Sequence, residues 1–357
     1  MRFVAINDAR TGMTVGQDVF ISSADAALLT KGQQLTPRFI ERMKDHGLPG
    51  VYVYDANNPT PLVLNNQPII SPRLKQEGLT AIEHVFKAIE YSTSAEAVKV
   101  IRQLDSVVDN LIDSLSYNKG VLINIGDIKS YDDYTYHHSM SVSILSIAIG
   151  ITLGIPRTKL NKLAQCALLH DIGKIFVPIE IINKPGKLTA NEFREIKKHP
   201  LHGYSYIKEN NIGTPDIGEI ICNHHEKVDG TGYPRGLQGR DIHLYSRIIS
   251  VADVYDALTS QRPYRTPSPP SEALEFIMGG SGTAFDYEVV RAFVAKVELY
   301  AVGSYVLLSN NEKARVLSNL KNRPVVEIAG SGDIIDLYRN PNYLNVVIAR
   351  CLEPSEA

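Results

Sequence analysis

Cysteines are scarce in this chain of 357 residues, and the three present are far apart. Cys166, Cys222 and Cys351 form no CxxC pair, which indicates reduced thiols in a cytoplasmic protein and excludes a disulfide framework. An excess of charge is also lacking, since 37 Lys and Arg oppose 39 Asp and Glu. We therefore expect no binding of polymeric nucleic acid through a basic face, and any anion site must be local.

Long apolar runs are missing as well. The best candidate, residues 142–155, is shorter than the roughly 18 apolar residues of a membrane span and is interrupted by Ser, Thr and Gly. The first residues, MRFVAINDARTGMTV, carry charges where a signal peptide needs an apolar core. The sequence therefore predicts a cytoplasmic protein without membrane insertion.

The residue pattern divides the chain into four parts, and the length suits roughly two or three domains. Residues 1–68 mix short alternating stretches with one helical run, which predicts a small α+β domain. Apolar residues at helical spacing predict a helical connector over 69–130 and an all-α domain over 131–298. Short β-branched runs between turn residues predict a β-rich extension over 299–357. The expected fold class is α+β multidomain, with a central all-α domain.

Individual helices are expected where the apolar spacing is regular. A capping box formed by Thr189 and Glu192 predicts a helix that begins there and ends at His199. The other expected helices are 37–46, 79–91, 95–115, 134–153, 157–170, 215–226, 244–260, 271–278 and 286–297.

Histidines are concentrated in the central region, where eight of the ten lie between His137 and His243. The tandem His170-Asp171 follows an apolar helix. Adjacent residues on a helix point about 100° apart, so they can reach two metal ions instead of chelating one. Imidazole and carboxylate together suit iron, manganese, zinc or similar ions. The tandem therefore predicts a metal site.

Further ligands must come from other segments. His138 lies where its helix begins its apolar face, His199 is expected at the end of the capped helix, and His224 and His225 at the end of theirs. Asp253 is an acid among apolar residues, where an unpaired carboxylate would be costly to bury. Each residue alone is more typical of a structural role. Together they indicate one shared site.

Several long motifs resemble the HD-GYP family, bacterial metal-dependent phosphodiesterases of cyclic dinucleotides within the HD superfamily. The motifs are HDIGK at 170–174, NKPGKLT at 183–189, HP at 199–200, HHEKVDGTGYPRGL at 224–237 and ADVYDALTSQRPYR at 252–265. The resemblance covers roughly residues 132–297. About the first 65 residues are similar to a small domain that precedes some HD-GYP units, and the β-rich tail resembles a common C-terminal extension.

The resemblance implies a complete set of metal ligands. They are His138, His170, Asp171, His199, His224, His225 and Asp253. Family members with three metals have a glutamate four residues before the first histidine, and here that position is Tyr134. A phenol does not replace a bridging carboxylate at neutral pH. Two divalent transition-metal ions are therefore expected, with iron or manganese first and other divalent metals open.

The resemblance also implies roles in hydrolysis. Two ions about 3.5–4 Å apart generate a nucleophile at neutral pH and neutralise charge on the phosphate. Asp171 is the expected catalytic bridge between them, and Lys174 the catalytic point charge that reaches the scissile phosphate. Arg262 and Arg265 match a basic pair that grips the substrate's phosphates, for which the planar guanidinium is suited.

The glycine loop after the paired histidines is expected to fold over the site. Gly230 and Gly232 would let the backbone approach the substrate closely. Tyr233 would stack on a base or bond a phosphate, and Pro234 stiffens the turn. These residues complete the expected substrate-binding set.

The function implied by the resemblance is hydrolysis of a 3′,5′-cyclic dinucleotide in bacterial second-messenger signalling. Cyclic di-GMP is the first choice, with linear pGpG as product and onward conversion to GMP open. One alternative is a phosphodiesterase specific for a hybrid cyclic GMP-AMP. Another is a non-catalytic nucleotide-binding or adaptor protein, although such proteins usually lose metal ligands and none is lost here. A homodimer and signalling protein partners are compatible with the sequence.

Overall fold

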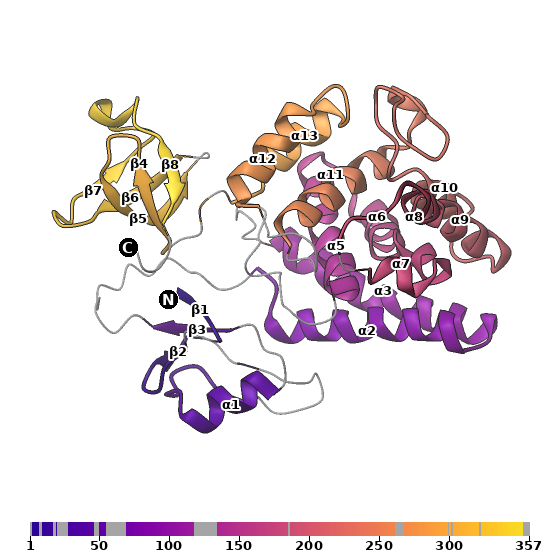
Figure 1. The fold of residues 1–357 in the computed structure, drawn as a ribbon, viewed down its shortest axis with the longest axis horizontal. Helices are drawn as coiled ribbons and strands as arrows, with labels where there is room; N and C mark the ends of the chain where they lie inside the picture. Colours follow the sequence, from indigo (N-terminus) through magenta and orange to yellow (C-terminus); the bar gives the residue numbers. More distant parts are fainter. Residues whose placement is uncertain are drawn as a thin grey trace. The chain divides into compact units, whose positions relative to one another are not determined.

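The structure is a computed structural model (Figure 1) that describes residues 2–6, 9–16, 19, 28–45, 50–54, 69–117, 134–184, 186–260, 268–298, 300, 303–320 and 323–352. The chain divides into two compact units. One includes Met1–Pro68 and Val297–Ala357, and the other includes Ile69–Val121 and Asp133–Lys296. The expected fold class is confirmed, because a helical core is accompanied by separate β-containing parts. The four-part domain division stays a prediction.

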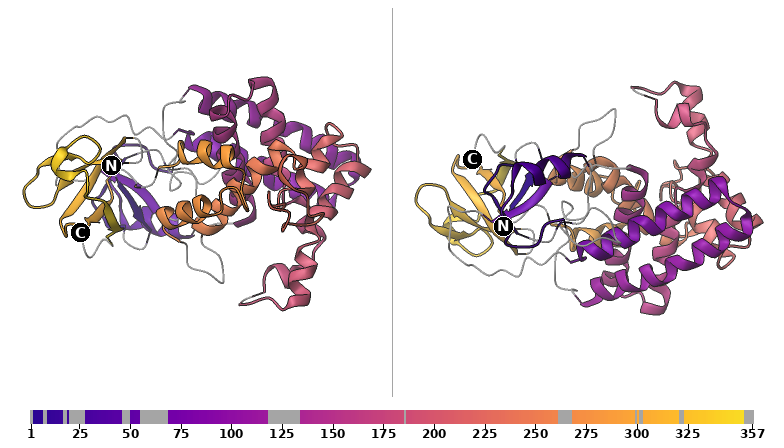
Figure 2. Two further views of the ribbon diagram at one scale, coloured as in Figure 1. Left: turned by 90° about the horizontal axis from the view of Figure 1, so that it is seen from above. Right: turned by 90° about the horizontal axis from the view of Figure 1, so that it is seen from below.

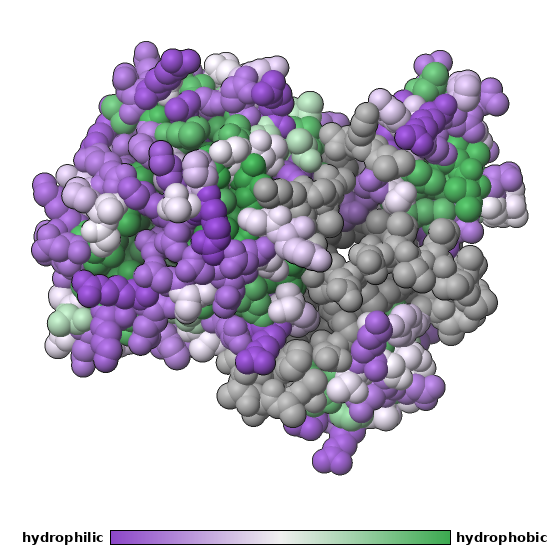
Figure 3. All heavy atoms as spheres, turned by 180° about the vertical axis from the view of Figure 1, so that it is seen from behind, coloured by the Kyte–Doolittle hydropathy of each residue, from purple (hydrophilic) through white to green (hydrophobic). Residues whose placement is uncertain are grey.

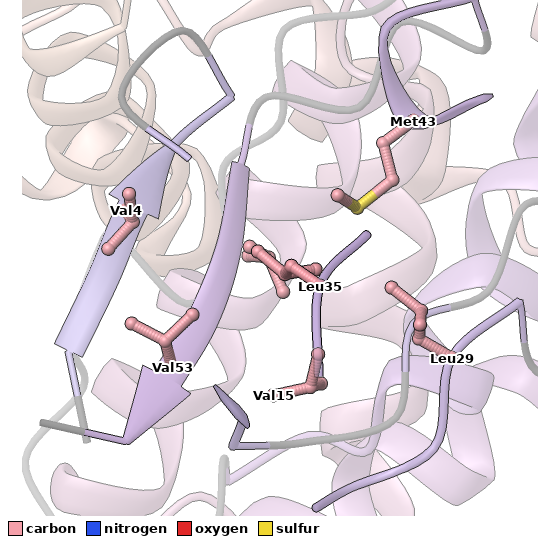
Figure 4. Packing of buried hydrophobic residues seen from close by; sticks show 7 residues of the cluster. Val4, Val15, Leu29, Leu35, Met43 and Val53 are labelled. Carbon is pink, nitrogen blue, oxygen red and sulfur yellow. The ribbon is translucent and has the colours of Figure 1, made fainter. Parts of the chain in front are cut away.

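The N-terminal part is a small antiparallel sheet with one helix. Its strands β1 (Arg2–Ala5), β2 (Thr14–Val15) and β3 (Gly50–Tyr54) lie in the order β1-β3-β2, and α1 covers Pro37–Asp45. Side chains from the strands, the helix and the segment between them form one apolar core, shown in Figure 4: Val4, Val15, Leu29, Leu35, Met43, Val51 and Val53. This core holds the helix against the sheet in so short a segment.

The C-terminal part is an antiparallel sheet with the order β7-β6-β5-β4-β8. Its strands are β4 (Tyr305–Leu308), β5 (Lys313–Leu320), β6 (Arg323–Ile328), β7 (Ile334–Asp336) and β8 (Ile348–Cys351), with the short helix η3 (Pro341–Tyr343) before β8. Burial alternates along β4 and β6, so one face carries the core. The β-rich extension is confirmed; the three-residue β7 was not predicted because it is too short to show alternation.

The helical unit holds the other helices. They are α2 (Pro72–Tyr91), α3 (Ser94–Tyr117), α5 (Tyr134–Thr152), α6 (Arg157–Leu169), η1 (Ile172–Phe176), α7 (Ile179–Ile182), α8 (Ala190–Ile196), α9 (His199–Glu209), α10 (Asp216–Cys222), η2 (Gly239–Asp241), α11 (Leu244–Thr259), α12 (Pro270–Gly279) and α13 (Tyr287–Val294). Every residue from His138 to Gly150 of α5 is buried. A helix buried on all sides is the centre of its unit, and α2, α6, α11 and α13 pack against α5.

Helices α2 and α3 pack on each other and on the helices that follow. Side-chain hydrogen bonds join α3 to α6: Arg157 donates to Asp109 and Asp113, and Asn161 donates to Asp109. Leu111 and Leu115 of α3 are buried. Residues 69–117 therefore belong to the same compact unit as the later helices.

One predicted helix end is wrong. The capping box is present, with Thr189 accepting from the Glu192 amide and Glu192 accepting from the Thr189 amide. Helix α8 nevertheless ends at Ile196, and His199 begins α9 instead of ending α8. Pro200 lies in the first turn of α9, where proline fits because no intrahelical N–H bond is lost. Pro200, which suggested the end of the capped helix, thus marks the beginning of the next one.

A second correction concerns the paired histidines. Helix α10 ends at Cys222, so His224 and His225 lie in the turn after the helix and not within its last residues. The chain leaves the helix at Asn223, and the turn brings the loop back so that the Tyr233 amide donates to the His225 carbonyl oxygen at 3.2 Å. That contact is impossible for residues in a continuing helix.

One face of the helical unit is mainly polar (Figure 3), while Ile179 and Phe193 on the segment with α7 and α8 are exposed. Figure 2 shows the segment with α7 and α8 projecting from the rest of this unit, and hydrophilic side chains predominate over the unit's face in Figure 3. Among the described residues, none of the helices combines the length and apolar character required to cross a membrane.

Replacing Gly173 by alanine should destabilise the helical unit. A Cβ at Gly173 would lie 1.9 Å from the His199 carbonyl oxygen and 2.5 Å from the Gly203 nitrogen, so η1 and α9 would have to separate. We expect a loss of about 3 kcal/mol in the free energy of unfolding, measured by urea denaturation. Gly279→Ala is the matched control, because no described atom lies within 4 Å of its Cβ. Equal stability of the two variants would contradict this packing.

Candidate metal centre

The histidines and aspartates singled out from the sequence meet inside the helical unit. They come from α5, the α6–η1 junction, the start of α9, the turn after α10 and the middle of α11: His138, His170, Asp171, His199, His224, His225 and Asp253. All are buried except His225, whose side chain is 22% exposed. Segments more than a hundred residues apart in sequence therefore contribute to one cluster.

Asp171 lies at the centre of this cluster. Its Oδ1 is 3.2 Å from His199 Nε2 and 4.0 Å from His224 Nε2. Its Oδ2 is 3.4 Å from Nε2 of both His138 and His170. The two oxygens of one carboxylate thus face two different pairs of imidazoles, which is the arrangement that a carboxylate shared by two cations requires.

The ligand atoms gather in overlapping groups whose members lie within 4.8 Å of one another. The groups are His199 with His224 and His225, His138 with His170 and Asp171, and His170 with His224 and Asp253. The donors also show what is missing: His170 Nε2 and Asp171 Oδ1 are buried without a hydrogen-bond partner in the described part of the chain. Buried polar atoms are rarely left so, and a cation would satisfy both. The residues present therefore fit a metal.

Backbone carbonyls fix the tautomer of most of these histidines. The Nδ1–H groups donate to the carbonyl oxygen three residues earlier, from His170 to Ala167 at 2.8 Å, from His199 to Ile196 at 2.8 Å and from His224 to Ile221 at 2.5 Å. A carbonyl oxygen only accepts, so Nδ1 carries the proton and the lone pair of Nε2 faces the cluster. The histidines are set as metal ligands before any ion arrives.

The pKa values of these side chains also favour metal binding. Burial and the neighbouring imidazoles hold the pKa of His224 well below its usual range, and burial lowers the pKa of His225 to about 3. Burial alone would raise the pKa of Asp171, but Lys174 and the adjacent histidines outweigh it and hold that pKa well below the ordinary value. Burial of Asp253 is likewise outweighed, first by the hydrogen bond with His138. Neutral imidazoles and ionised carboxylates are the forms that bind divalent cations.

Lys174 lies at the edge of the cluster, on η1. Its ammonium is 2.5 Å from Asp171 Oδ2, and the side chain is 28% exposed, whereas Asp171 is 2% exposed. The lysine thus contacts the buried carboxylate and is itself partly exposed to solvent. Its expected contact with a phosphate stays a prediction.

The glycine loop packs on the cluster through Tyr233. The Tyr233 ring stacks on the His225 ring, with centroids 4.8 Å apart and planes 27° apart. Gly230 has φ of +83°, and a Cβ at Gly232 would lie 2.3 Å from the Lys227 nitrogen. The close approach that glycine allows is therefore to the chain's own backbone. Contacts of Gly230, Gly232 and Tyr233 with a substrate stay predictions.

Glu226 is a site residue that the sequence reasoning missed. The residue is 2% exposed, and its carboxylate accepts the backbone N–H groups of Arg235 at 2.6 Å, Gly236 at 3.1 Å and Leu237 at 3.1 Å. A buried carboxylate that accepts several N–H groups fixes the backbone that donates them. The available sequence signal for this role was an acid directly after the paired histidines and before the glycine loop.

Asp256 was also missed. Its Oδ2 is 2.7 Å from Nδ1 of His138, and both side chains are 1% exposed. It lies three residues after Asp253 on α11, so both acids share one helix face. That spacing was the available signal.

Some expected site residues lie outside the described part of the chain. These are Arg262 and Arg265, together with the side chain of Tyr134. Their expected roles stay predictions.

Comparison with known proteins identifies the type of domain. Residues 122–289 match the family model described as HD domain. A cyclic di-GMP phosphodiesterase of Pseudomonas aeruginosa is 39% identical over 211 residues, 59% of this chain and 51% of that protein. A 3′3′-cGAMP-specific phosphodiesterase of Vibrio cholerae is 43% identical over 145 residues, 41% of this chain and 33% of that protein. The chain thus spans about half or less of the length of these relatives.

A solved structure supports the fold. The HDG"Y"P protein Bd1817 from Bdellovibrio bacteriovorus superposes with a TM-score of 0.53 at 21% identity, covering 82% of this chain and 97% of that chain. At this identity the likeness concerns the fold alone.

Removing the Glu226 carboxylate should loosen the glycine loop. In Glu226→Ala three backbone N–H groups lose a charged acceptor, a change worth about 1.5–3 kcal/mol for a single such bond. Amide hydrogen exchange at residues 235–237 should accelerate by more than about tenfold, as measured by mass spectrometry. Glu219→Ala is the control, since it removes only an exposed ion pair with Arg235, worth about 0–1 kcal/mol. Equal exchange in both variants would refute the role of Glu226.

The metal-free protein should lose stability as the pH falls from 7 to 5. Histidines of the unfolded chain take up protons near pH 6.5, whereas folded His224 and His225 stay neutral, the latter down to about pH 3. The unfolded state then binds more protons, so this stability is complete above pH 6.5 and is lost below it. The aspartates are ionised in both states across this window.

The free energy of unfolding should fall by up to about 1.4 kcal/mol per pH unit for each histidine, measured by urea denaturation after chelation of metal. His225→Gln removes one titrating group and should give a shallower slope than the unsubstituted chain. Identical slopes would show that His225 is protonated in the folded state.

Proposed function

The chain contains an HD domain, and we propose that this domain hydrolyses a 3′,5′-cyclic dinucleotide in a metal-dependent reaction. Cyclic di-GMP is the proposed substrate and linear pGpG the product, with GMP as a further product. The observation that carries the proposal is the buried Asp171 carboxylate, whose two oxygens face two separate pairs of imidazoles. The relatives named as cyclic di-GMP phosphodiesterases support the substrate class.

We propose two divalent ions that share Asp171. One would be held with His199, His224 and His225, whose ligand atoms form one group. The other would be held with His138, His170 and Asp253, since Asp253 Oδ1 lies 3.2 Å and 4.0 Å from Nε2 of the two histidines. Imidazole and carboxylate donors suit iron and manganese. When bound, two such ions supply a nucleophile at neutral pH and neutralise charge on a phosphate.

The chain's own residues bind and orient the substrate in this proposal. Lys174 is exposed enough to turn from Asp171 to a phosphate oxygen, where its ammonium acts as a point charge. Arg262 and Arg265 are proposed to hold the phosphates through bidentate hydrogen bonds. Tyr233 is held by stacking on His225, with the Lys197 ammonium 4.6 Å from its ring centroid, and is proposed to contact a base or a phosphate.

The competing substrate is a hybrid cyclic GMP-AMP, which the name of the Vibrio cholerae relative favours. A receptor or adaptor without catalysis is the alternative with less support, because the full donor set is present and gathered in one cluster. We place the protein in the cytoplasm as a signalling enzyme, with a small domain at 1–68, a helical connector at 69–130, the catalytic domain at 131–298 and a β-rich extension at 299–357. A homodimer and signalling protein partners are part of the proposal.

A turnover assay tests the proposed function. Protein purified without oxygen and loaded with Fe²⁺ or Mn²⁺ is incubated separately with cyclic di-GMP and cyclic GMP-AMP, and products are separated by chromatography. We expect cyclic di-GMP to be converted to pGpG. Faster turnover of cyclic GMP-AMP would transfer the proposal to that substrate, and binding of either nucleotide without turnover would identify a receptor.

Asp171→Ala should abolish hydrolysis and reduce the metal content while the helices persist. Mutating a residue that merely hydrogen-bonds to a metal ligand typically costs about 10–100-fold in metal affinity or activity. Losing a ligand shared by both ions should therefore lower turnover to below about one per cent of that of the unsubstituted chain. Metal analysis should show a fall from about two ions per chain. Asp241→Ala, at an exposed position on η2, is the control. Retention of two ions and of turnover in Asp171→Ala would exclude the bridging role.

A further inference from the structure

One imidazole of the cluster has a carboxylate oxygen near each of its nitrogens, and both acids come from a single helix. Asp253 Oδ1 lies 3.2 Å from Nε2 of His138, and Asp256 Oδ2 lies 2.7 Å from Nδ1 of the same ring. Both acids are on α11, whereas His138 is on α5. The contact between the two central helices of the unit therefore includes a fixed carboxylate–imidazole–carboxylate arrangement.

This environment separates His138 from the other buried histidines. His170, His199 and His224 each donate Nδ1–H to a neutral backbone carbonyl oxygen. The Nδ1 partner of His138 is a carboxylate instead, and that carboxylate also accepts from the Ser260 hydroxyl at 3.1 Å. The four Nδ1 contacts are similar in length, 2.5–2.8 Å, so the difference lies in the charge of the acceptor, and an ionised acceptor gives a stronger hydrogen bond than a neutral carbonyl.

A strong acceptor at Nδ1 has two consequences for Nε2. It holds the proton on Nδ1, which leaves the Nε2 lone pair directed into the cluster. It also draws positive charge toward the acceptor side of the ring, so Nε2 becomes a better electron-pair donor to a cation. Neither effect requires Asp256 to touch the cation.

We propose that Asp256 is a positioning residue that fixes the tautomer of His138 and strengthens it as a donor, and so sets the affinity for the ion that His138 helps to hold. The inference rests on the proposed function in one respect, since it takes His138 as a metal ligand. It predicts unequal sites: one ion depends on Asp256, while the ion near His199, His224 and His225 does not.

The competing explanation is purely structural, with Asp256 tying α11 to α5. Asp256→Asn distinguishes the two explanations. Asparagine has nearly the volume of aspartate and still offers an oxygen that accepts the Nδ1–H of His138. Only the negative charge is lost. Ser260→Ala is the matched control, since it removes the second partner of the same carboxylate oxygen without changing its charge.

Mn²⁺ binding to the full-length chain tests the proposal by competition with a fluorescent chelator. We expect Asp256→Asn to weaken one of the binding events by about 10–100-fold and to leave the other within about twofold of the unsubstituted chain. Ser260→Ala should leave both within about twofold. Unsubstituted affinity for both ions in Asp256→Asn would overturn the proposal, whereas a chain that binds both ions but hydrolyses no cyclic dinucleotide would overturn only the proposed function.

A measurement on the unsubstituted protein covers the case in which Asp256→Asn does not fold. In Zn²⁺-loaded protein with ¹⁵N-labelled histidine, the Nδ1 proton of His138 should resonate downfield of those of His170, His199 and His224, because its acceptor is charged. A resonance within the range of the other three, or a proton on Nε2 of His138, would overturn the proposal.

Discussion

The structure of the helical unit depends on one electrostatic constraint: the carboxylate of Asp171 is buried at the centre of a ring of imidazoles. A buried carboxylate must be matched by positive charge or hydrogen-bond donors. His170 and His199 donate Nδ1–H to backbone carbonyls, so the Nε2 atoms of both rings face the carboxylate. Lys174 reaches one oxygen, and the other has no hydrogen-bond partner in the described part of the chain. Cations are the partners that satisfy both the carboxylate and the rings.

The packing of the helices follows from this requirement. Helix α5 is buried from His138 to Gly150, and α11 packs against it with two acids close to the His138 ring. The α6–η1 junction approaches α9 so closely that only glycine fits at residue 173. Glu226 then binds the loop that returns over His225. Each of these features helps to position a residue of the cluster.

Local sequence predicted most of the elements and the members of the cluster. The capping box at Thr189 and the apolar spacing of α5 and α11 are local signals, and they were sufficient for the helices. The start of α9 at His199 was not predictable in the same way, because proline after a histidine suits either a stop or a first turn. Glu226 accepts backbone amides 9 to 11 residues later, and Asp256 contacts a ring 118 residues earlier, so both assignments required the folded chain.

The central claim is that Asp171 is shared by two ions. Anomalous scattering from crystals of the Mn²⁺-loaded protein measures this directly. Two peaks on opposite sides of the Asp171 carboxylate are predicted, one beside His199 and His224 and the other beside His138 and His170, each at about 2.0–2.2 Å from its nearest ligand atoms. A single peak, three fully occupied peaks, or peaks that do not contact Asp171 would contradict it.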